Sequence, residues 1–226
     1  MLFRSGEADR IAIVDERGEY IPVNDILLLL YWYLHEVRGE RGGVVRNLAT
    51  THLLDRLAHN LGEQCYEVPV GFKHIVSAMQ EHGALLGGES SGGLTIRGHI
   101  LGKDGIFAAA LIVEMLARTG KRVSELRETV YAVTGRLYAL EDSLPATPEM
   151  RAAVPRRLKE IPAGRLGPHR VVRVSQMDGT KLYLENDNWA LVRFSGTEPV
   201  LRLSVEADSE QKASELVELL RQFVRG

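Results

Sequence analysis

Two hydroxyls and a glycine stand between two arginines in a short segment near the C-terminus. The segment reads "RFSGTEPVLR" and contains Arg193, Ser195, Gly196, Thr197 and Arg202. A glycine allows the backbone to approach a ligand closely, and neighbouring N–H and hydroxyl groups attract an oxyanion. Forked guanidinium donors suit phosphate better than a point charge does. The segment therefore indicates a phosphate site, with a turn carrying two solvated arginines as the alternative.

A second segment, "GGESSGG", places Glu89 among four glycines after an apolar run. Such a density of glycine lets the backbone come close to a ligand, and one carboxylate can accept hydrogen bonds from two sugar hydroxyls. The segment indicates a sugar site; a flexible hairpin with an exposed glutamate is the alternative.

Lys73 lies two residues after Gly71 in "PVGFKHI", where an expected strand gives way to an expected helix. In an open α/β sheet, ligands collect at the loops beyond the strand ends. Lys73 is therefore a candidate ligand-binding cation, and a solvated surface lysine is the alternative.

Glu7 and Asp9 occupy alternate positions of "GEADR". Hard oxygen ligands of this kind suit Mg²⁺, which usually keeps several waters and shares a phosphate oxygen. Two carboxylates do not specify a metal site by themselves, so a solvated acidic turn is the alternative.

Composition limits the class of protein. The 226 residues are 45% hydrophobic and 26% charged, as in soluble globular proteins, and the net charge of −2 provides no basic field for nucleic acid or an anionic membrane. The most apolar run, residues 26–34, is shorter than the roughly 20 residues of a membrane span and is expected to be a buried helix. The single cysteine, Cys65, excludes an internal disulfide and favours a reducing compartment, so we expect a cytoplasmic protein.

Short apolar strands alternate with amphipathic helices in the first part of the chain. The expected strands are residues 11–14, 44–48, 65–68 and 84–86. The expected helices, from apolar residues spaced three and four apart, are residues 25–37, 51–61, 72–82, 105–119 and 124–131. Asn24 or Asp25 is expected to cap the first helix and Thr50 the second. This alternation predicts a layered α/β domain with a mostly parallel sheet.

The pattern changes after about residue 135. Five prolines between residues 145 and 168 predict an interrupted helix and then a loop. Strands are expected around residue 138 and at residues 171–175, 181–184, 190–194 and 200–206, followed by an amphipathic helix at residues 209–224. This part predicts a smaller α+β domain with an antiparallel sheet.

Four segments together carry a resemblance to a known family. They are "GEADRIAIVDERGEYI", "PVGFKHI", "GGESSGG" with "GHILGKDGI", and "RFSGTEPVLRLSVEA". In this order and spacing they resemble the α-D-phosphohexomutases, the phosphoglucomutase/phosphomannomutase group, over essentially the whole chain. Members have four domains, and this chain resembles their C-terminal half. The resemblance implies that residues 1–20 are the end of domain 2, residues 21–134 the sugar-binding domain 3 and residues 135–226 the phosphate-binding domain 4.

The resemblance also implies a role for each candidate residue. Two loops would bind the substrate. The phosphate would be bound by Arg193, Ser195, Gly196, Thr197 and Arg202. The sugar would be bound by Glu89, Ser91 and Gly92. Lys73 would reach the reacting or bound phosphate and Arg10 would lie near the phosphoryl-transfer centre, so both would be catalytic residues. Asp9 and Glu7 would be the remains of a Mg²⁺ site. The implied reaction interconverts hexose 1-phosphates and 6-phosphates through a phosphoserine and a bisphosphorylated sugar.

The metal loop departs from the family pattern. The family reads Asp-Gly-Asp-x-Asp-Arg where residues 5–10 of this chain read "SGEADR". One carboxylate is lost and another is longer by a methylene, which the near-octahedral geometry of Mg²⁺ tolerates poorly. We therefore expect weak or absent Mg²⁺ binding. Residues 1–5 are also expected not to continue the family's strand, as in a cloning scar or an aberrant start.

The family's nucleophilic serine lies in a Thr-Ala-Ser-His-Asn-Pro type segment, which does not occur in this sequence. Without a nucleophile, substrate contacts cannot become turnover. The chain alone is therefore expected to be an inactive part of a mutase that needs its N-terminal domains; a stand-alone sugar-phosphate-binding module is the alternative. Gly93 stands where the amino-sugar branch usually has His, which favours glucose or mannose phosphates, and His99 is either structural or ligand-facing.

Overall fold

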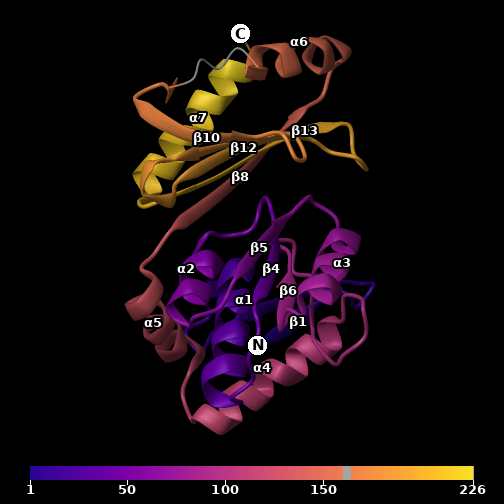
Figure 1. The fold of residues 1–226 in the computed structure, drawn as a ribbon, viewed down its shortest axis with the longest axis vertical. Helices are drawn as coiled ribbons and strands as arrows, with labels where there is room; N and C mark the ends of the chain where they lie inside the picture. Colours follow the sequence, from indigo (N-terminus) through magenta and orange to yellow (C-terminus); the bar gives the residue numbers. More distant parts are fainter. Residues whose placement is uncertain (160–163, 226) are drawn as a thin grey trace. The chain divides into compact units, whose positions relative to one another are not determined.

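The computed structural model describes residues 1–159 and 164–225 (Figure 1). The chain divides into two compact units, Met1–Arg136 and Leu137–Gly226, and each is described by itself. The junction expected between residues 134 and 135 lies two residues before this division. In the described part of the chain, no helix is both long and apolar enough to cross a membrane.

Unit 1 is built around a four-stranded sheet in the order β5-β4-β6-β7 (Figure 1). The first three of these strands are parallel, and β7 runs antiparallel to β6. The strands are β4 (Val44–Asn47), β5 (Cys65–Val68), β6 (Leu86–Gly88) and β7 (Leu94–Ile96). The helices are α1 (Val23–Trp32), α2 (Leu53–Asn60), α3 (Phe72–His82), α4 (Gly105–Thr119) and α5 (Val123–Thr134). This arrangement confirms the α/β class expected for the first part of the chain.

Strand β6 passes between two helices at very close range. A Cβ on Gly87 would lie 2.4 Å from the side chain of Ile75 in α3, and a Cβ on Gly88 would lie 2.3 Å from Leu27 in α1. These distances are shorter than non-bonded carbon–carbon contacts, so a side chain at either position would force the buried Ile75 or Leu27 to move. The strand expected at residues 84–86 is therefore placed two residues too early, because glycines in a strand pattern are ordinarily a sign of its end.

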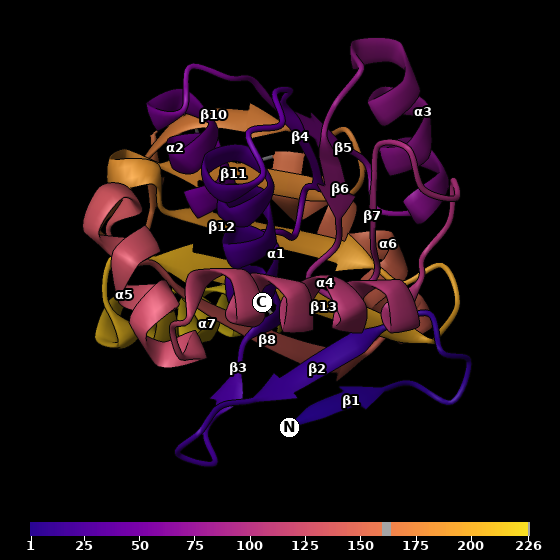
Figure 2. The same cartoon turned by 90° about the horizontal axis from the view of Figure 1, so that it is seen from below.

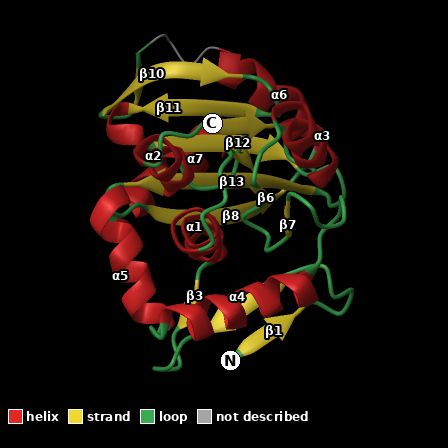
Figure 3. Ribbon diagram, turned by 60° about the horizontal axis from the view of Figure 1, so that its bottom comes forward, coloured by secondary structure: helices red, strands yellow, loops and turns green. Residues whose placement is uncertain are grey.

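Helix α1 is the centre of unit 1 (Figure 3). It contacts α2, α4 and α5, and residues 26–30 are each at most 2% exposed. A helix that is apolar all round must be buried, which confirms the expectation for this run. The helix follows Pro22 and has no side-chain cap, so the expected capping by Asn24 or Asp25 is wrong. It ends in a π-helical turn, η1 (Tyr33–Val37).

A second, antiparallel sheet of unit 1 joins β1 (Leu2–Arg4), β2 (Ile11–Val14) and β3 (Tyr20–Ile21). Helix α4 packs against β1 and β2 (Figure 2). Strand β2 has its expected bounds. Residues 1–5 were expected not to continue the family's strand, yet Leu2–Arg4 is a strand that pairs in register with β2. The neighbouring strand supplies hydrogen-bond partners that so short a segment cannot find within itself.

Unit 2 contains a six-stranded antiparallel sheet in the order β8-β13-β12-β11-β10-β9. Its strands are β8 (Tyr138–Pro145), β9 (Arg165–Leu166), β10 (His169–Ser175), β11 (Thr180–Leu184), β12 (Trp189–Phe194) and β13 (Val200–Ala207). A 3₁₀ turn, η2 (Glu185–Asp187), joins β11 to β12, and the helices are α6 (Pro148–Lys159) and α7 (Glu210–Arg225). The α+β class with an antiparallel sheet is confirmed.

The apolar core of unit 2 lies between one face of this sheet and the helices α6 and α7 (Figure 1). Leu201, Leu203 and Val205 alternate along β13 and are fully buried in this core. Helix α6 continues through Pro155, so the expected interruption is wrong. The loop expected around Pro162 falls at residues 160–163, outside the described residues.

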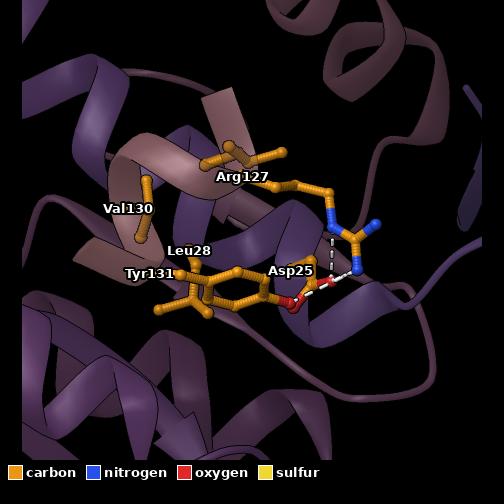
Figure 4. A pocket seen from close by; sticks show the side chains of 6 residues that line it. Asp25, Leu28, Arg127, Val130 and Tyr131 are labelled. Carbon is orange, nitrogen blue, oxygen red and sulfur yellow. Dashed lines mark hydrogen bonds and ion pairs between the residues drawn. The ribbon is translucent and has the colours of Figure 1, made fainter. Parts of the chain in front are cut away.

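A buried ion pair joins α5 to α1 (Figure 4). Asp25 is 6% exposed, and its carboxylate accepts hydrogen bonds from Arg127, with the Tyr131 hydroxyl beside them; the Arg127 Nε distance is 2.9 Å. Burial raises the pKa of Asp25 above its ordinary value, and the hydrogen bonds and the guanidinium charge oppose that rise. The ion pair with Arg127 therefore offsets the free-energy cost of burying the Asp25 carboxylate in α1.

Arg127→Met is expected to destabilise the protein by about 3 kcal/mol, because it leaves the Asp25 carboxylate buried without its counter-charge. The loss should shrink as the pH falls below neutrality. The folded-state pKa of Asp25 is already raised and would rise further in the variant, so the folded state takes up a proton before the unfolded state does. Urea denaturation at several pH values measures both effects.

Arg118→Met is the matched control, since this arginine of α4 has a side chain that is 51% exposed and its pair with Glu114 is on the surface. Its expected effect is below about 1 kcal/mol at any pH. The assigned role of the buried pair would be contradicted if Arg127→Met lost no more stability than Arg118→Met, or if its loss of stability grew as the pH fell.

Candidate functional site

The Ser195 loop joins β12 to β13 in unit 2. Ser195 is 9% exposed, whereas Gly196 and Thr197 at the tip are exposed. The Oγ of Ser195 accepts hydrogen bonds from the backbone N–H groups of Thr197 and Glu198, at 3.4 and 3.2 Å. A Cβ on Gly196 would meet no atom within 4 Å, so there is open space at the turn. The loop is thus a compact cluster of N–H and O–H groups of the kind that binds oxyanions.

Arg193 and Arg202 flank this loop on one face of the sheet. They lie directly opposite each other on β12 and β13, and directly opposed side chains of antiparallel strands share a face. Each guanidinium is engaged by a carboxylate: Arg193 Nε donates to Asp178 at 2.9 Å, and Arg202 pairs with Glu198. These carboxylates allow two like charges to stand side by side.

Glu89 follows β6 in unit 1 and is 7% exposed. Its two carboxylate oxygens accept hydrogen bonds from Asn47 Nδ2 at 3.4 Å and from Ser91 Oγ at 3.3 Å. Thr50 Oγ1 donates to Asn47 Oδ1 at 2.9 Å and accepts from the N–H of Ser90 at 3.1 Å. Thr50 therefore belongs to this network. The expectation that it caps α2 is wrong, because α2 has no side-chain cap.

Two glycines tie residues 5–10, which we call the acidic loop, to the rest of unit 1. The carbonyl of Gly92 accepts a hydrogen bond from the first N–H of β2 at 3.2 Å, and Gly92 adopts φ +98°. Gly105 donates its N–H to the Ala8 carbonyl at 2.9 Å, and a Cβ on Gly105 would lie 2.6 Å from the carbonyl oxygen of Arg10. These backbone contacts thus join the acidic loop to residues 87–93, which we call the sugar loop, and to the start of α4.

The side chains of the acidic loop do not fit Mg²⁺. Asp9 accepts a hydrogen bond from Ser5 Oγ at 2.8 Å and pairs with Lys103 Nζ at 2.7 Å. The hydrogen bond from Lys103, and then that from Ser5, holds the pKa of Asp9 below its ordinary value. Glu7 is exposed, and among the described residues no three His, Cys, Asp or Glu side chains come together as in a metal site. A single carboxylate with both oxygens engaged lacks the ligands that Mg²⁺ needs.

The Lys73 side chain is exposed, whereas the His99 side chain is held by contacts at the start of α4. Lys73 is exposed and is the second residue of α3, and the ring of the preceding Phe72 lies 6.0 Å from Lys103 Nζ. The start of α3 therefore adjoins Lys103. His99 Nε2 lies 3.0 Å from Asp104, which caps α4, and the His99 ring stacks on the third residue of that helix. These contacts favour the structural role for His99.

Comparison with known proteins assigns the family. Residues 22–133 match "Phosphoglucomutase/phosphomannomutase, alpha/beta/alpha domain III" and residues 149–222 match "Phosphoglucomutase/phosphomannomutase, C-terminal domain". The chain belongs to the α-D-phosphohexomutase family. The two matches, in this order, place it in the C-terminal portion of that family's members.

Relatives share the family and differ in the substrate they are named for. The chain is 33% identical over 218 residues to a phosphoglucomutase/phosphomannomutase of Thermococcus kodakarensis. This match covers 96% of the chain and 45% of the relative. It is 33% identical over 221 residues to a probable phosphoglucosamine mutase of Pyrococcus furiosus, covering 97% and 46%. A crystal structure from Thermus thermophilus, described as a putative phosphomannomutase, matches the whole chain with a TM-score of 0.79 at 32% identity, over 46% of that protein. The chain thus spans about half the length of these relatives.

Three side chains that hold the candidate site were not predicted from the sequence as site residues. They are Asn47, Thr50 and Lys103. Asn47 ends β4, and a polar residue at the end of a parallel strand is a signal that the expected sheet already contained. Nothing local in "GHILGKDGI" indicates that Lys103 pairs with Asp9, because the two lie in loops far apart in the sequence.

Gly105→Ala is expected to destabilise unit 1 by about 1–3 kcal/mol, because the added Cβ would press against backbone atoms of the acidic loop that cannot yield as a side chain can. Gly102→Ala is the control, since a Cβ there would meet no atom within 4 Å. Denaturation curves followed by circular dichroism compare the two. Equal stabilities would show that this contact does not constrain the loop.

Proposed function

We propose that the chain is the sugar- and phosphate-binding C-terminal part of a hexose-phosphate mutase. The observation that carries the proposal is the cluster of backbone N–H groups and hydroxyls in the Ser195 loop, flanked by opposed arginines in a chain of this family. In unit 1, the carboxylate of Glu89 is held by neutral donors and would accept hydrogen bonds from sugar hydroxyls. Arg10 and Lys73 would add positive charge for the reacting phosphate.

The reaction proposed for the whole enzyme is reversible transfer of a phosphoryl group between the C1 and C6 hydroxyls of a hexose. A serine would carry the phosphoryl group between the two positions, and no segment of that type occurs in this sequence. The residues present would bind and orient the sugar phosphate and supply fixed positive charge. The chain alone is therefore expected to lack mutase activity.

A bound phosphate dianion would replace Glu198 as the ion-pair partner of Arg202. Glu198 has a side chain that is 57% exposed, so its pair with Arg202 is worth little and can be replaced. The pair of Arg193 with Asp178 is less exposed, at 17% and 29%, and would keep Arg193 in place beside the loop. The phosphate would then receive Arg202, the Ser195 hydroxyl and the loop N–H groups together.

The first test is calorimetric titration of the chain with the 1-phosphates and 6-phosphates of glucose, mannose and glucosamine. Ser195→Ala and Arg202→Ala are each expected to weaken binding about tenfold or more, the loss of a hydrogen bond to a charged group. Arg170→Ala is the matched control, because Arg170 is an exposed arginine of β10 paired with Glu185. Equal weakening in Arg202→Ala and Arg170→Ala, with none in Ser195→Ala, would show that only net charge matters.

Binding by a well-folded chain without turnover is also what the alternative, a stand-alone binding module, predicts. Adding the N-terminal domains of a family member separates the two, since mutase activity on mixing supports an enzyme part and its absence supports the module. A folded chain that binds none of the sugar phosphates contradicts both.

Glu89→Gln is expected to weaken sugar-phosphate binding about tenfold while leaving binding of inorganic phosphate unchanged, because Glu89 would contact only the sugar hydroxyls. Glu81→Gln, at an exposed position of α3, is the control for the loss of a charge in the same unit. The same titrations with glucose 1-phosphate and with phosphate measure the effect. Parallel weakening of both ligands would remove Glu89 from the sugar site.

A further inference from the structure

We propose that Lys103 takes the place of a divalent cation at the acidic loop, so that this loop is ordered and charge-balanced without metal. Asp9 has a side chain that is 17% exposed, and its Oδ2 lies 2.7 Å from Lys103 Nζ. Its other oxygen accepts the Ser5 hydroxyl at 2.8 Å. A metal ion at Oδ2 of Asp9 would meet the ammonium group of Lys103.

Contacts with three segments of unit 1 fix the position of Lys103. A Cβ on Gly93 would lie 2.2 Å from Cδ of Lys103, so the stem of Lys103 passes directly over Gly93 and would have to move if that residue carried a side chain. The Phe72 ring lies 6.0 Å from Nζ. Two residues beyond Lys103, Gly105 binds the backbone of the acidic loop through its N–H. Gly93 and Lys103 therefore form one structural feature, in which the missing side chain of one leaves room for the other.

The charges at this loop also disfavour a metal. The Oδ2 atom of Asp9 lies 2.7 Å from Lys103 and 3.7 Å from the guanidinium of Arg10. Two cations thus share one carboxylate, and among the described residues no three His, Cys, Asp or Glu side chains come together to form a ligand set. A divalent ion would therefore meet a carboxylate that two cations already neutralise.

The first arm of the test is titration of the whole chain with Mn²⁺, a paramagnetic substitute for Mg²⁺, followed by electron paramagnetic resonance. We expect no saturable binding at micromolar Mn²⁺. One bound Mn²⁺ that is lost in Asp9→Asn would overturn the proposal. This arm uses no sugar phosphate, so its outcome is separate from that of the proposed function.

The second arm compares melting temperatures in EDTA and in millimolar Mg²⁺. Lys103→Met keeps the side-chain stem and removes the charge, so we expect it to melt about 2–4 °C below the wild type in EDTA. The wild type, Lys103→Arg and the exposed-site control Lys121→Met should each have the same melting temperature with and without Mg²⁺. A rise in the melting temperature of the wild type with Mg²⁺, or a melting temperature of Lys103→Met equal to that of Lys121→Met, would overturn the proposal.

A failure of Lys103→Met to fold would be resolved by the double variant Asp9→Asn, Lys103→Met. If the charge of Asp9 is what needs Lys103, neutralising both restores a folded protein with a wild-type circular dichroism spectrum. A double variant that also fails to fold would show that Lys103 acts by packing its stem across Gly93, and the substitution for a cation would be wrong.

Discussion

Two helices press against the two faces of β6, and the rest of unit 1 depends on this close packing. Gly87 lies against α3 and Gly88 against α1, and neither position has space for a side chain. Protein interiors are packed so closely that even one added methylene is felt. The strand is therefore fixed in depth and register. Glu89, the next residue, is placed at the strand end beside Asn47 of the parallel neighbour β4, so the sugar loop depends on that packing.

Elements with local signals were predicted to the residue, and elements that exist through a partner were not. Helices α3 and α4 and strand β5 have their expected bounds, because apolar periodicity and, for the helices, a terminal glycine mark them. Strands β1 and β3 are three and two residues long and are strands only because β2 pairs with both. The glycines of β6 were taken for a loop because the helices that exclude side chains there are distant in the sequence.

The candidate loops were recognisable from residue types, but their internal partners were not. Hydroxyls, glycines and arginines at short spacing indicate an anion site whatever the fold. That Arg193 meets Asp178 follows from the pairing of β11 with β12, which brings a turn beside a strand end. Thr50 was taken for a cap because a threonine before a helix usually is one, yet its hydroxyl instead links Asn47 to the sugar loop. The residue types that could bind a ligand lie close together in the sequence, whereas the residues that hold them in place come from distant segments.

An ammonium group and a magnesium ion are unequal partners for Asp9. Both neutralise the carboxylate, but Mg²⁺ also offers open coordination positions to a phosphoryl oxygen and a second charge to the transition state. An ammonium group offers one charge and hydrogen bonds. A loop closed by Lys103 would therefore keep its shape and would lack the positions through which a metal assists transfer. This agrees with the proposal that the residues of this chain bind and orient a sugar phosphate.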